Sequence, residues 1–147
     1  MRYPIVYGPN QLLPLEWCLI RRALDRRPII VLPDGGLRLI ARGYSVNTAH
    51  AVLCTMDRAQ GASGQIYNCA DERQLTLRQM AEVVARALDH EWKIVSLPAA
   101  LARPSWPTIF TDAQGSWHRL YDVNKIKREL GYDDVVPAVE AVTATVQ

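Results

Sequence analysis

Four arginines close together in the first fifth of this 147-residue chain could hold a phosphate group. They are Arg21, Arg22, Arg26 and Arg27. The last two fall where an expected helix ends, and the helix dipole already favours cations at that position. We therefore interpret the four arginines as a solvated basic face, with phosphate binding as the alternative.

The histidines and cysteines do not form a pattern typical of a metal site. His50, His90 and His118 are far apart in the sequence, and none has a second ligand at helical spacing. The cysteines are odd in number, widely spaced and set in apolar runs, which favours buried thiols in a reducing compartment over a disulfide framework. These are Cys18, Cys54 and Cys69. The sequence predicts no metal ligands and a cytoplasmic location.

Composition and charge exclude several classes of partner. With 49% hydrophobic and 22% charged residues, the chain has an ordinary globular composition, and its length suits one domain with a core. A net charge of +2, spread along the sequence, provides no concentrated basic face for nucleic acid or an anionic membrane. No apolar run has the length of a membrane span or the form of a signal peptide. We expect neither nucleic acid nor a membrane as a partner.

The first elements of the expected fold are a strand and an amphipathic helix. Residues 2–7 predict a buried strand of the parallel type, which Gly8 and Pro9 end. Because this strand begins with almost no lead-in, the chain is expected to start in the middle of a fold. Residues 14–27 predict a helix. Its expected apolar stripe is Leu13, Trp17, Ile20 and Leu24.

The middle of the chain predicts short strands around a second helix. Residues 28–32 and 37–41 are expected to pair across a turn at 33–36, whose two glycines are free to take positive φ. A helix is expected over 46–58. The Gly61-x-x-Gly64 segment is interpreted as a flexible joint, and residues 65–69 predict an apolar strand.

The best-defined helix signal begins at Thr76. Thr76 and Gln79 have the spacing of a capping box, and an apolar stripe follows them. That stripe is Leu77, Met80, Val84 and Leu88. Residues 93–97 predict a strand, and residues 98–117 predict an irregular wrap. The aromatic residues of this wrap, Trp106, Phe110 and Trp117, are interpreted as packing over the core, with a ligand pocket as the alternative.

Two helices are expected at the carboxyl end of the sequence. Asp122 is placed to cap a helix that Gly131 ends, with apolar residues on one side. Pro137 is placed to start the last helix, which carries a valine stripe. All these elements must position whatever site the chain carries.

Four segments, in order, resemble the NAD-dependent epimerases and dehydratases of the extended short-chain dehydrogenase/reductase superfamily. Residues 2–9 read Arg-Tyr-Pro-Ile-Val-Tyr-Gly-Pro, which is similar to the family's Arg-Tyr-Phe-Asn-Val-Tyr-Gly-Pro. Residues 42–51 resemble the Arg-Gly-Tyr-x-x-Asn-x-Ala stretch of atypical members. Residues 67–79 resemble a Tyr-Asn block followed by Leu-Thr-Leu-Arg-Glu, and residues 121–132 resemble a block that ends in Glu-Leu-Gly-Tyr.

This resemblance implies an α/β fold that corresponds to the C-terminal portion of a Rossmann-type extended short-chain dehydrogenase. It covers the whole chain but only part of a typical member, so most of the nucleotide-binding sheet is expected to be absent. Residues 1–147 are interpreted as a single partial domain. Residues 1–9 are the last part of a Rossmann strand and its turn, and residues 10–147 are mainly the substrate-binding lobe and the C-terminal helices.

The two motifs that carry cofactor binding and catalysis in the family do not occur here in full. Members hold the dinucleotide on a Gly-x-x-Gly-x-x-Gly loop, whereas Gly61-x-x-Gly64 lacks the third glycine and precedes a strand. Tyr121-x-x-x-Lys125 has the spacing of the catalytic Tyr-x-x-x-Lys pair. A cap at Asp122 would leave Tyr121 outside the helix, so we assign no catalytic residue. NAD or NADP is expected in full-length relatives, and neither is expected to bind this chain alone.

The resemblance also implies candidate binding residues. Tyr3, Pro4 and Tyr7 match positions near the nicotinamide end of the cofactor, with a plain strand and its stop as the alternative. Ile5 stands where many sugar-nucleotide epimerases have an Asn that binds substrate, so an aliphatic side chain replaces a polar one. Arg42 matches an Arg that pairs with a substrate phosphate, and stacking on a neighbouring tyrosine is the alternative.

Three functions follow as hypotheses. The first is a substrate-lobe portion of an NAD(P)-dependent epimerase/dehydratase, for a nucleotide-sugar or related small molecule, without catalysis of its own. The second is an interaction module, because a strand with open edges favours pairing with a second copy or with a separate Rossmann-half chain. The third is a truncated relic, which predicts low stability because the sheet has lost its covering layers.

Overall fold

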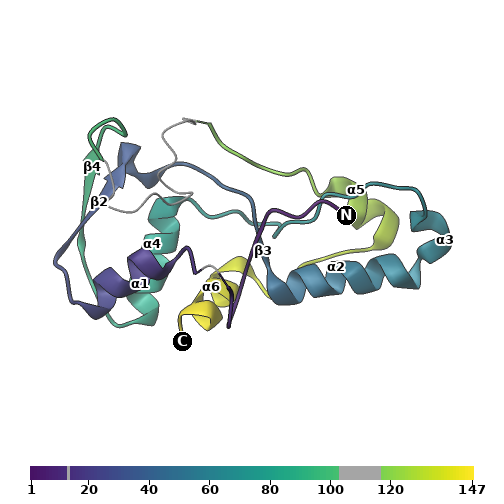
Figure 1. Ribbon diagram of the computed structural model, residues 1–147, viewed down its shortest axis with the longest axis horizontal. Helices are drawn as coiled ribbons and strands as arrows, with labels where there is room; N and C mark the ends of the chain where they lie inside the picture. The colour runs from purple at the N-terminus through teal and green to yellow at the C-terminus, as the bar shows by residue number, and fades with distance from the viewer. Residues whose placement is uncertain (13, 103–116) are drawn as a thin grey trace.

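The computed structural model describes residues 1–12, 14–102 and 117–147, which form an elongated α/β arrangement (Figure 1). Its strands make two separate parallel pairs. Strand β1 (Ile5–Tyr7) pairs with β3 (Arg42–Tyr44), and strand β2 (Ile29–Pro33) pairs with β4 (Lys93–Leu97). Both pairs are parallel and alternate with helices along the chain, as the predicted α/β class requires.

Helices surround these two strand pairs. Helices α1 and α4 lie beside β2 and β4 at one end of the molecule, and α2, α3 and α5 lie at the other (Figure 1). The helices are α1 (Trp17–Leu24), α2 (Ser45–Asp57), α3 (Ala59–Ala62), α4 (Leu77–Ala87), α5 (Asn124–Leu130) and α6 (Ala138–Val146), with a 3-10 turn η1 (Asp34–Gly36).

The opening strand forms and stops where the sequence predicts, but it is less buried than expected. Tyr7 is buried, whereas Ile5 is only half-buried and Val6 is 42% exposed. The chain turns at Gly8, whose φ of +153° favours glycine and whose added Cβ would collide with Ser45. One face of β1 therefore lacks a covering layer within the part of the chain that the structure describes.

The predicted pairing of residues 28–32 with 37–41 is wrong. Strand β2 takes β4 as its parallel partner, and residues 39–40 form only isolated bridges, to Thr76 and Arg119. Gly35 and Gly36 do adopt positive φ, but within the 3-10 turn, so the chain does not return along β2. Parallel strands need a long crossover, which here runs through α2 and α4.

Helix α1 forms, but it buries a different face from the predicted stripe. Its buried residues are Leu19, Ile20 and Ala23, whereas Trp17 and Leu24 are exposed. The helix begins at Trp17, later than predicted, and it packs against α4. Tertiary contact with α4 therefore decides which side of α1 faces the core. The predicted stripe residue Leu13 lies outside the described residues.

The capping box of α4 is confirmed. The Gln79 backbone N donates to Thr76 Oγ1 at 3.1 Å, and the Thr76 backbone N donates to Gln79 Oε1 at 2.9 Å. The stripe residues Leu77, Met80 and Val84 are all buried. Helix α4 thereby supplies the centre of the main core.

The predictions for the other helices hold with small changes. Helix α2 covers nearly the predicted range, and α5 ends at Gly131, whose φ is +61°. The Asp122 carboxylate accepts from the Asn124 backbone N at 2.8 Å, so it binds the first turn of α5. Residues 65–69 make one bridge, Asn68 to Arg2, instead of a strand.

Two further segments complete the comparison with the sequence. Gly61 lies in the short helix α3, so it is not a simple joint, and Gly64 follows with a φ of +72°. Most of the predicted wrap, including Trp106 and Phe110, lies outside the described residues, while Trp117 is exposed.

The core is divided into two clusters of different size. The main cluster joins β1, β2, β3, α1, α4 and α6, with Met80 and Val84 among its most buried residues. The second cluster is smaller and joins α2 to α5. Its buried members are Ala51, Ala62, Tyr67, Cys69, Ile126, Leu130 and Tyr132. The three cysteines are free thiols, of which Cys69 is buried and Cys18 and Cys54 are half-buried.

Candidate functional site

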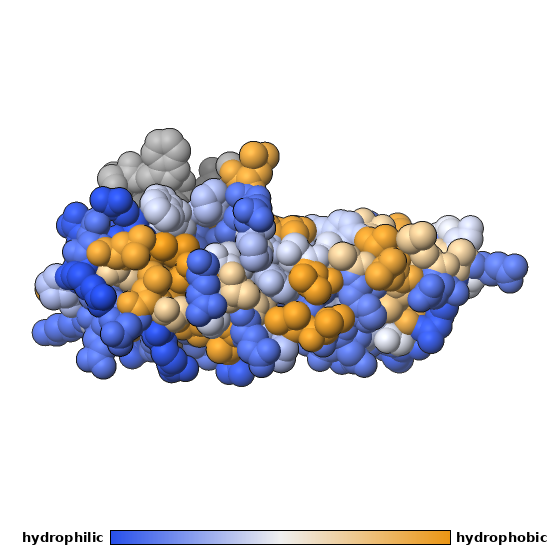
Figure 2. All heavy atoms as spheres, turned by 90° about the horizontal axis from the view of Figure 1, so that it is seen from below, coloured by the Kyte–Doolittle hydropathy of each residue, from blue (hydrophilic) through white to orange (hydrophobic). Residues whose placement is uncertain are grey.

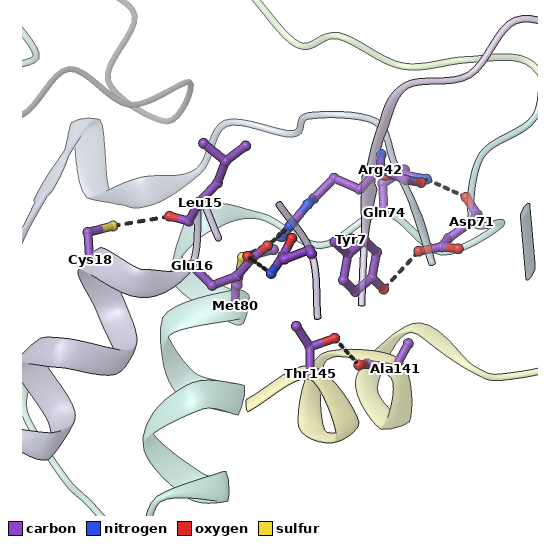
Figure 3. Close-up of polar contacts among 11 residues, drawn as sticks. Tyr7, Leu15, Glu16, Cys18, Arg42, Asp71, Gln74, Met80, Ala141 and Thr145 are labelled. Carbon is purple, nitrogen blue, oxygen red and sulfur yellow. Dashed lines mark hydrogen bonds and ion pairs between the residues drawn. The ribbon is translucent and has the colours of Figure 1, made fainter. Parts of the chain in front are cut away.

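Arg42, the first residue of β3, lies at the centre of a buried group of charged and aromatic side chains. It is 4% exposed, and it forms an ion pair with Glu16, which is 0% exposed (Figure 3). Glu16 immediately precedes α1, so the pair joins α1 to β3. Burial lowers the pKa of the Arg42 guanidinium to about 10, which leaves it protonated at neutral pH.

Arg42 is held on its other sides by an aromatic ring, a thioether and an amide. The guanidinium carbon lies 4.4 Å from the centre of the Tyr7 ring, which is a cation–π distance. Arg42 Nη1 lies 2.9 Å from Met80 Sδ. The Arg42 backbone N donates to Gln74 Oε1 at 2.9 Å. The ring and the thioether contact the Arg42 guanidinium, and the Gln74 amide holds the Arg42 backbone.

Asp71 accepts three hydrogen bonds on the side of the Tyr7 ring away from Arg42. Its carboxylate accepts from Tyr7 Oη at 2.8 Å, from the Tyr44 backbone N at 2.8 Å and from Asn47 Nδ2 at 3.0 Å. Asp71 is itself buried. Burial, followed by the charge of Asp71, raises the pKa of the Tyr7 hydroxyl well above its usual value of 10.0. Tyr7 therefore stays a neutral donor.

A small cavity, of about 10 Å³, adjoins these side chains. Apolar residues of α4 and α6 form part of its wall. Its polar and charged lining consists of Tyr7, Arg42, Asp71, Arg73 and Gln74. Two arginines and one aspartate therefore border a space that is about large enough for one water molecule.

The structure brings only one of the predicted cofactor residues to this site. Tyr7 contacts Arg42 and Asp71, as described above. Tyr3 is exposed, and its hydroxyl lies 3.0 Å from Met1 Sδ. Pro4 lies beside Gly43, where an added Cβ would approach Pro4 Cγ to 3.7 Å. The roles of Tyr3, Pro4 and Tyr7 toward a cofactor stay predictions.

The two predicted substrate residues lie opposite each other in the β1–β3 pair. Ile5 is the register partner of Arg42. Ile5 is half-buried, and its aliphatic side chain offers no hydrogen bond. Arg42 does stack on a tyrosine, as the alternative interpretation allows, but the tyrosine is Tyr7. Their roles toward a substrate stay predictions.

Tyr121 and Lys125 make separate contacts. Tyr121 precedes α5, which begins at Asn124, so Tyr121 lies outside the helix as expected. Lys125 Nζ donates to Gln65 Oε1 at 2.8 Å and lies 4.9 Å from the centre of the Tyr67 ring. Because Lys125 is committed to these partners, its spacing from Tyr121 has a structural explanation.

Sequence analysis missed Glu16 and Asp71, the two acids of the site. Glu16 stands between Leu15 and Trp17, and an acid between two apolar residues at a helix start looks like an ordinary first-turn charge. Asp71 follows the Tyr67-Asn68 pair that carries part of the family resemblance. Only the tertiary fold shows that both carboxylates are buried.

The described residues include no group of three or more potential ligands that could hold a metal ion. No described helix has both the length and the apolar character that crossing a membrane requires.

Comparisons with known proteins define the fold. No family model matches the chain. It is similar to UDP-D-apiose/UDP-D-xylose synthase 2 of Arabidopsis thaliana, with 26% identity over 136 residues, which are 88% of this chain and 34% of the synthase.

Solved structures agree over nearly the whole chain. UDP-glucuronic acid 4-epimerase from Bacillus cereus, in complex with UDP-glucuronic acid and NAD, matches with a TM-score of 0.69 and 16% identity, over 99% of this chain and 42% of the epimerase. RMD from Pseudomonas aeruginosa, complexed with NADPH, matches with a TM-score of 0.68 and 14% identity, over 97% of this chain and 44% of that protein.

The chain therefore has the fold of part of an extended short-chain dehydrogenase/reductase of the epimerase and dehydratase type. This confirms the resemblance that the four sequence segments predict. The chain spans about a third of the curated synthase and about two fifths of the similar structures. Full-length structural relatives bind NAD or NADPH.

Proposed function

We propose that this chain is the substrate-lobe portion of an NAD(P)-dependent epimerase/dehydratase that acts on nucleotide sugars or related molecules, and that it has no turnover alone. The observation that carries the proposal is that 99% of the chain matches only 42% of an epimerase that holds both UDP-glucuronic acid and NAD. A chain of this extent supplies one part of a site that needs the other part for chemistry.

The motifs in the chain support the absence of catalysis. The sequence contains no Gly-x-x-Gly-x-x-Gly loop to receive a pyrophosphate at a helix N-terminus. Lys125 donates to Gln65 and lies against Tyr67, so it is not available to lower the pKa of Tyr121. We accordingly propose that the purified chain binds neither NAD nor NADP. Its three free cysteines support a reducing, cytoplasmic location.

The proposed division of the chain follows its two kinds of candidate residue. Residues 1–9, with Tyr3, Pro4 and Tyr7, form the last Rossmann strand and turn and face the cofactor in a complete enzyme. Residues 10–147 form mainly the substrate lobe, where Arg42 binds a substrate phosphate. Ile5 lies opposite Arg42 and gives the substrate an apolar wall where relatives have a polar group.

Calorimetry tests this proposal directly. The purified chain is titrated with NAD⁺, NADP⁺ and UDP-glucuronic acid, and turnover is assayed with UDP-glucuronic acid and NAD⁺ together. We expect binding of the sugar nucleotide, no binding of either dinucleotide and no turnover. Redox or epimerase turnover by the chain alone contradicts the proposal, and so does tight binding of NAD⁺ or NADP⁺.

The second candidate function is an interaction module, and the open edge of β1 favours it. Among the described residues, β1 pairs only with β3, and Val6 is exposed on it. An unpaired strand edge with an apolar side chain is a template for another chain, either a second copy or a separate Rossmann half. This function is compatible with the first, because the partner could complete an enzyme.

Light scattering and affinity capture test the interaction module. The expected result is a dimer, or a specific complex with a separate Rossmann-half chain. Val6→Lys is expected to abolish the complex, whereas the control Val135→Lys changes an exposed valine outside β1 and leaves the complex intact. A monomer with no captured partner contradicts this function.

A further inference from the structure

Glu16 is the most unusual side chain in the described structure, because a carboxylate with 0% exposure stands at the start of an amphipathic helix. It makes two contacts. One is the ion pair with Arg42, and the other is a hydrogen bond from Gln11 Nε2 to Glu16 Oε2 at 2.8 Å. A buried carboxylate is stable only when it is paired, so the Arg42 contact keeps Glu16 inside the protein.

Glu16 is also the acid that faces the Arg42 guanidinium, since the other buried acid is engaged elsewhere. The Asp71 carboxylate accepts from Tyr7 Oη on the far side of the Tyr7 ring (Figure 3), and it also accepts from Tyr44 N and Asn47 Nδ2. The planar fork of donors on Arg42 fits a carboxylate and a phosphate equally well in shape. Arg73 and Asp71 line the same small cavity as Arg42, so two cations and one anion border it.

We infer that Glu16 is an internal stand-in for a ligand phosphate: it occupies Arg42 in the empty protein and is displaced when a phosphate-bearing ligand binds. The ligand class, a nucleoside diphosphate, rests on the proposed function. The anion exchange at Arg42 rests on the buried Glu16–Arg42 ion pair. The pair therefore selects against weak anions, because an incoming group must compete with a carboxylate that is already in place.

Displacement of Glu16 does not require α1 to leave the core. Helix α1 is anchored by Leu19, Ile20 and Ala23, which lie beyond Glu16 along the helix. The segment before Glu16 is exposed at residues 9, 10 and 12. We expect a change of the Glu16 rotamer, with movement of this segment, to release the carboxylate.

The substitution Glu16→Gln tests this inference, because it keeps the shape and the acceptor for Gln11 but removes the charge. Arg42 is then a buried cation that lacks its Glu16 counterion, and an added anion replaces the missing charge. In chloride-free buffer, we expect inorganic pyrophosphate to bind Glu16→Gln at least about tenfold more tightly than the natural chain. Pyrophosphate is also expected to raise the melting temperature of the variant more.

Two variants serve as controls. Glu82→Gln removes an acid from an exposed pair with Arg78, whose atoms are 3.0 Å apart, and should leave pyrophosphate binding unchanged. Glu16→Gln combined with Arg42→Gln removes both charges and should lose the gained affinity. Equal pyrophosphate binding by Glu16→Gln and the natural chain overturns the inference, as does a gain that persists without Arg42.

A second measurement uses the natural chain and so does not depend on the folding of a variant. Hydrogen exchange of residues 9–16 is followed before and after addition of UDP at saturating concentration. Release of Glu16 is expected to increase exchange in this segment, whereas unchanged or slower exchange overturns the inference.

The result with UDP-glucuronic acid separates the two proposals. One outcome is that pyrophosphate binds Glu16→Gln tightly but the sugar nucleotide binds neither chain. Glu16 then competes with anions for Arg42, and the proposed nucleotide-sugar function is wrong. If the sugar nucleotide binds both chains equally, the proposed function stands and the role of Glu16 fails.

Discussion

The two ends of the molecule differ in the size of the hydrophobic core that each contains. At the α1–α4 end, the main core joins three strands and three helices, and the buried Glu16–Arg42 pair lies where α1 meets β3. At the α2–α5 end, the smaller cluster is all that joins the helices, and α2 leaves apolar side chains in solvent. These are Val46, Val52, Leu53 and Met56.

The surface view shows exposed apolar residues at both ends of the molecule (Figure 2). Figure 2 shows hydrophobic residues spread over the α2 end of the molecule as well as beside α1. Contiguous exposed apolar patches mark interaction sites or ligand grooves, whereas single exposed apolar residues are common on protein surfaces. The comparison therefore contrasts the buried charged side chains around Arg42 with the exposed apolar side chains on α2.

The largest expected loss of stability tests the buried hydrogen bonds to Asp71. Asp71→Ala removes the acceptor for three buried donors, on Tyr7, Tyr44 and Asn47, and should lower the free energy of unfolding by about 3–5 kcal/mol. Urea unfolding followed by circular dichroism measures it. Asp133→Ala, the matched control, removes an exposed acid that pairs with Lys127, and should cost about 0–1 kcal/mol. Equal costs would show that the Asp71 network is not a rigid centre.

A pair of leucine substitutions compares the two clusters directly. Leu19 in the main cluster and Leu130 in the second are both 3% exposed. Each change to Ala should cost about 2–5 kcal/mol, and the smaller cluster should collapse more easily around its cavity. We therefore expect Leu19→Ala to be the more destabilising variant in urea unfolding. If Leu130→Ala lowers the free energy of unfolding more than Leu19→Ala does, the second cluster collapses less easily than the main one, and the expectation is wrong.

Helix caps extend the comparison to smaller effects. Thr76→Ala removes the side chain of the capping box on α4 and should cost about 1 kcal/mol. Asp122→Ala removes a single bond to the first turn of α5, from Asn124 N, and should cost less. Thermal unfolding of both variants against the natural chain provides the measurement. A costlier Asp122→Ala would place the more important cap at the α5 end.

Local signals in the sequence predict much of this fold, because they act within a few residues. The capping box at Thr76, the stop at Gly131 and the turn after Tyr7 all depend on neighbouring residues, and all three form. Strands β2 and β4 pair although they are about sixty positions apart, and no local signal in either strand indicates which strand it pairs with. The hairpin prediction failed for that reason.

The candidate site was predictable only in part. Arg42 and Tyr7 lie in segments with a family resemblance. In the structure the Arg42 guanidinium carbon lies 4.4 Å from the centre of the Tyr7 ring. Glu16 carries no such signal, because its importance depends on how α1 packs against β3. The polarity of a residue can be read from the sequence, whereas the burial of a charge is a property of the tertiary fold.

The smallest expected effect is on the ionisation of two buried tyrosines. It changes the free energy of unfolding only at alkaline pH. Tyr7 lies in the main cluster and Tyr132 in the second, and burial raises the pKa of both hydroxyls above 10.0. Above about pH 10 the unfolded chain loses protons that these two residues keep in the folded state, so the free energy of unfolding falls as the pH rises. Phenolate absorbance at about pH 11 should therefore increase when urea unfolds the chain.

Phenylalanine variants assign that increase to the two ends of the molecule. Tyr7→Phe and Tyr132→Phe should each reduce the urea-dependent rise in absorbance, because each removes one hydroxyl that folding protects. If the α2–α5 end opens more readily, Tyr132 should ionise in the folded chain before Tyr7 as the pH rises. Simultaneous ionisation would mean that both clusters unfold as one cooperative unit, and the contrast between the two ends would then concern the surface alone.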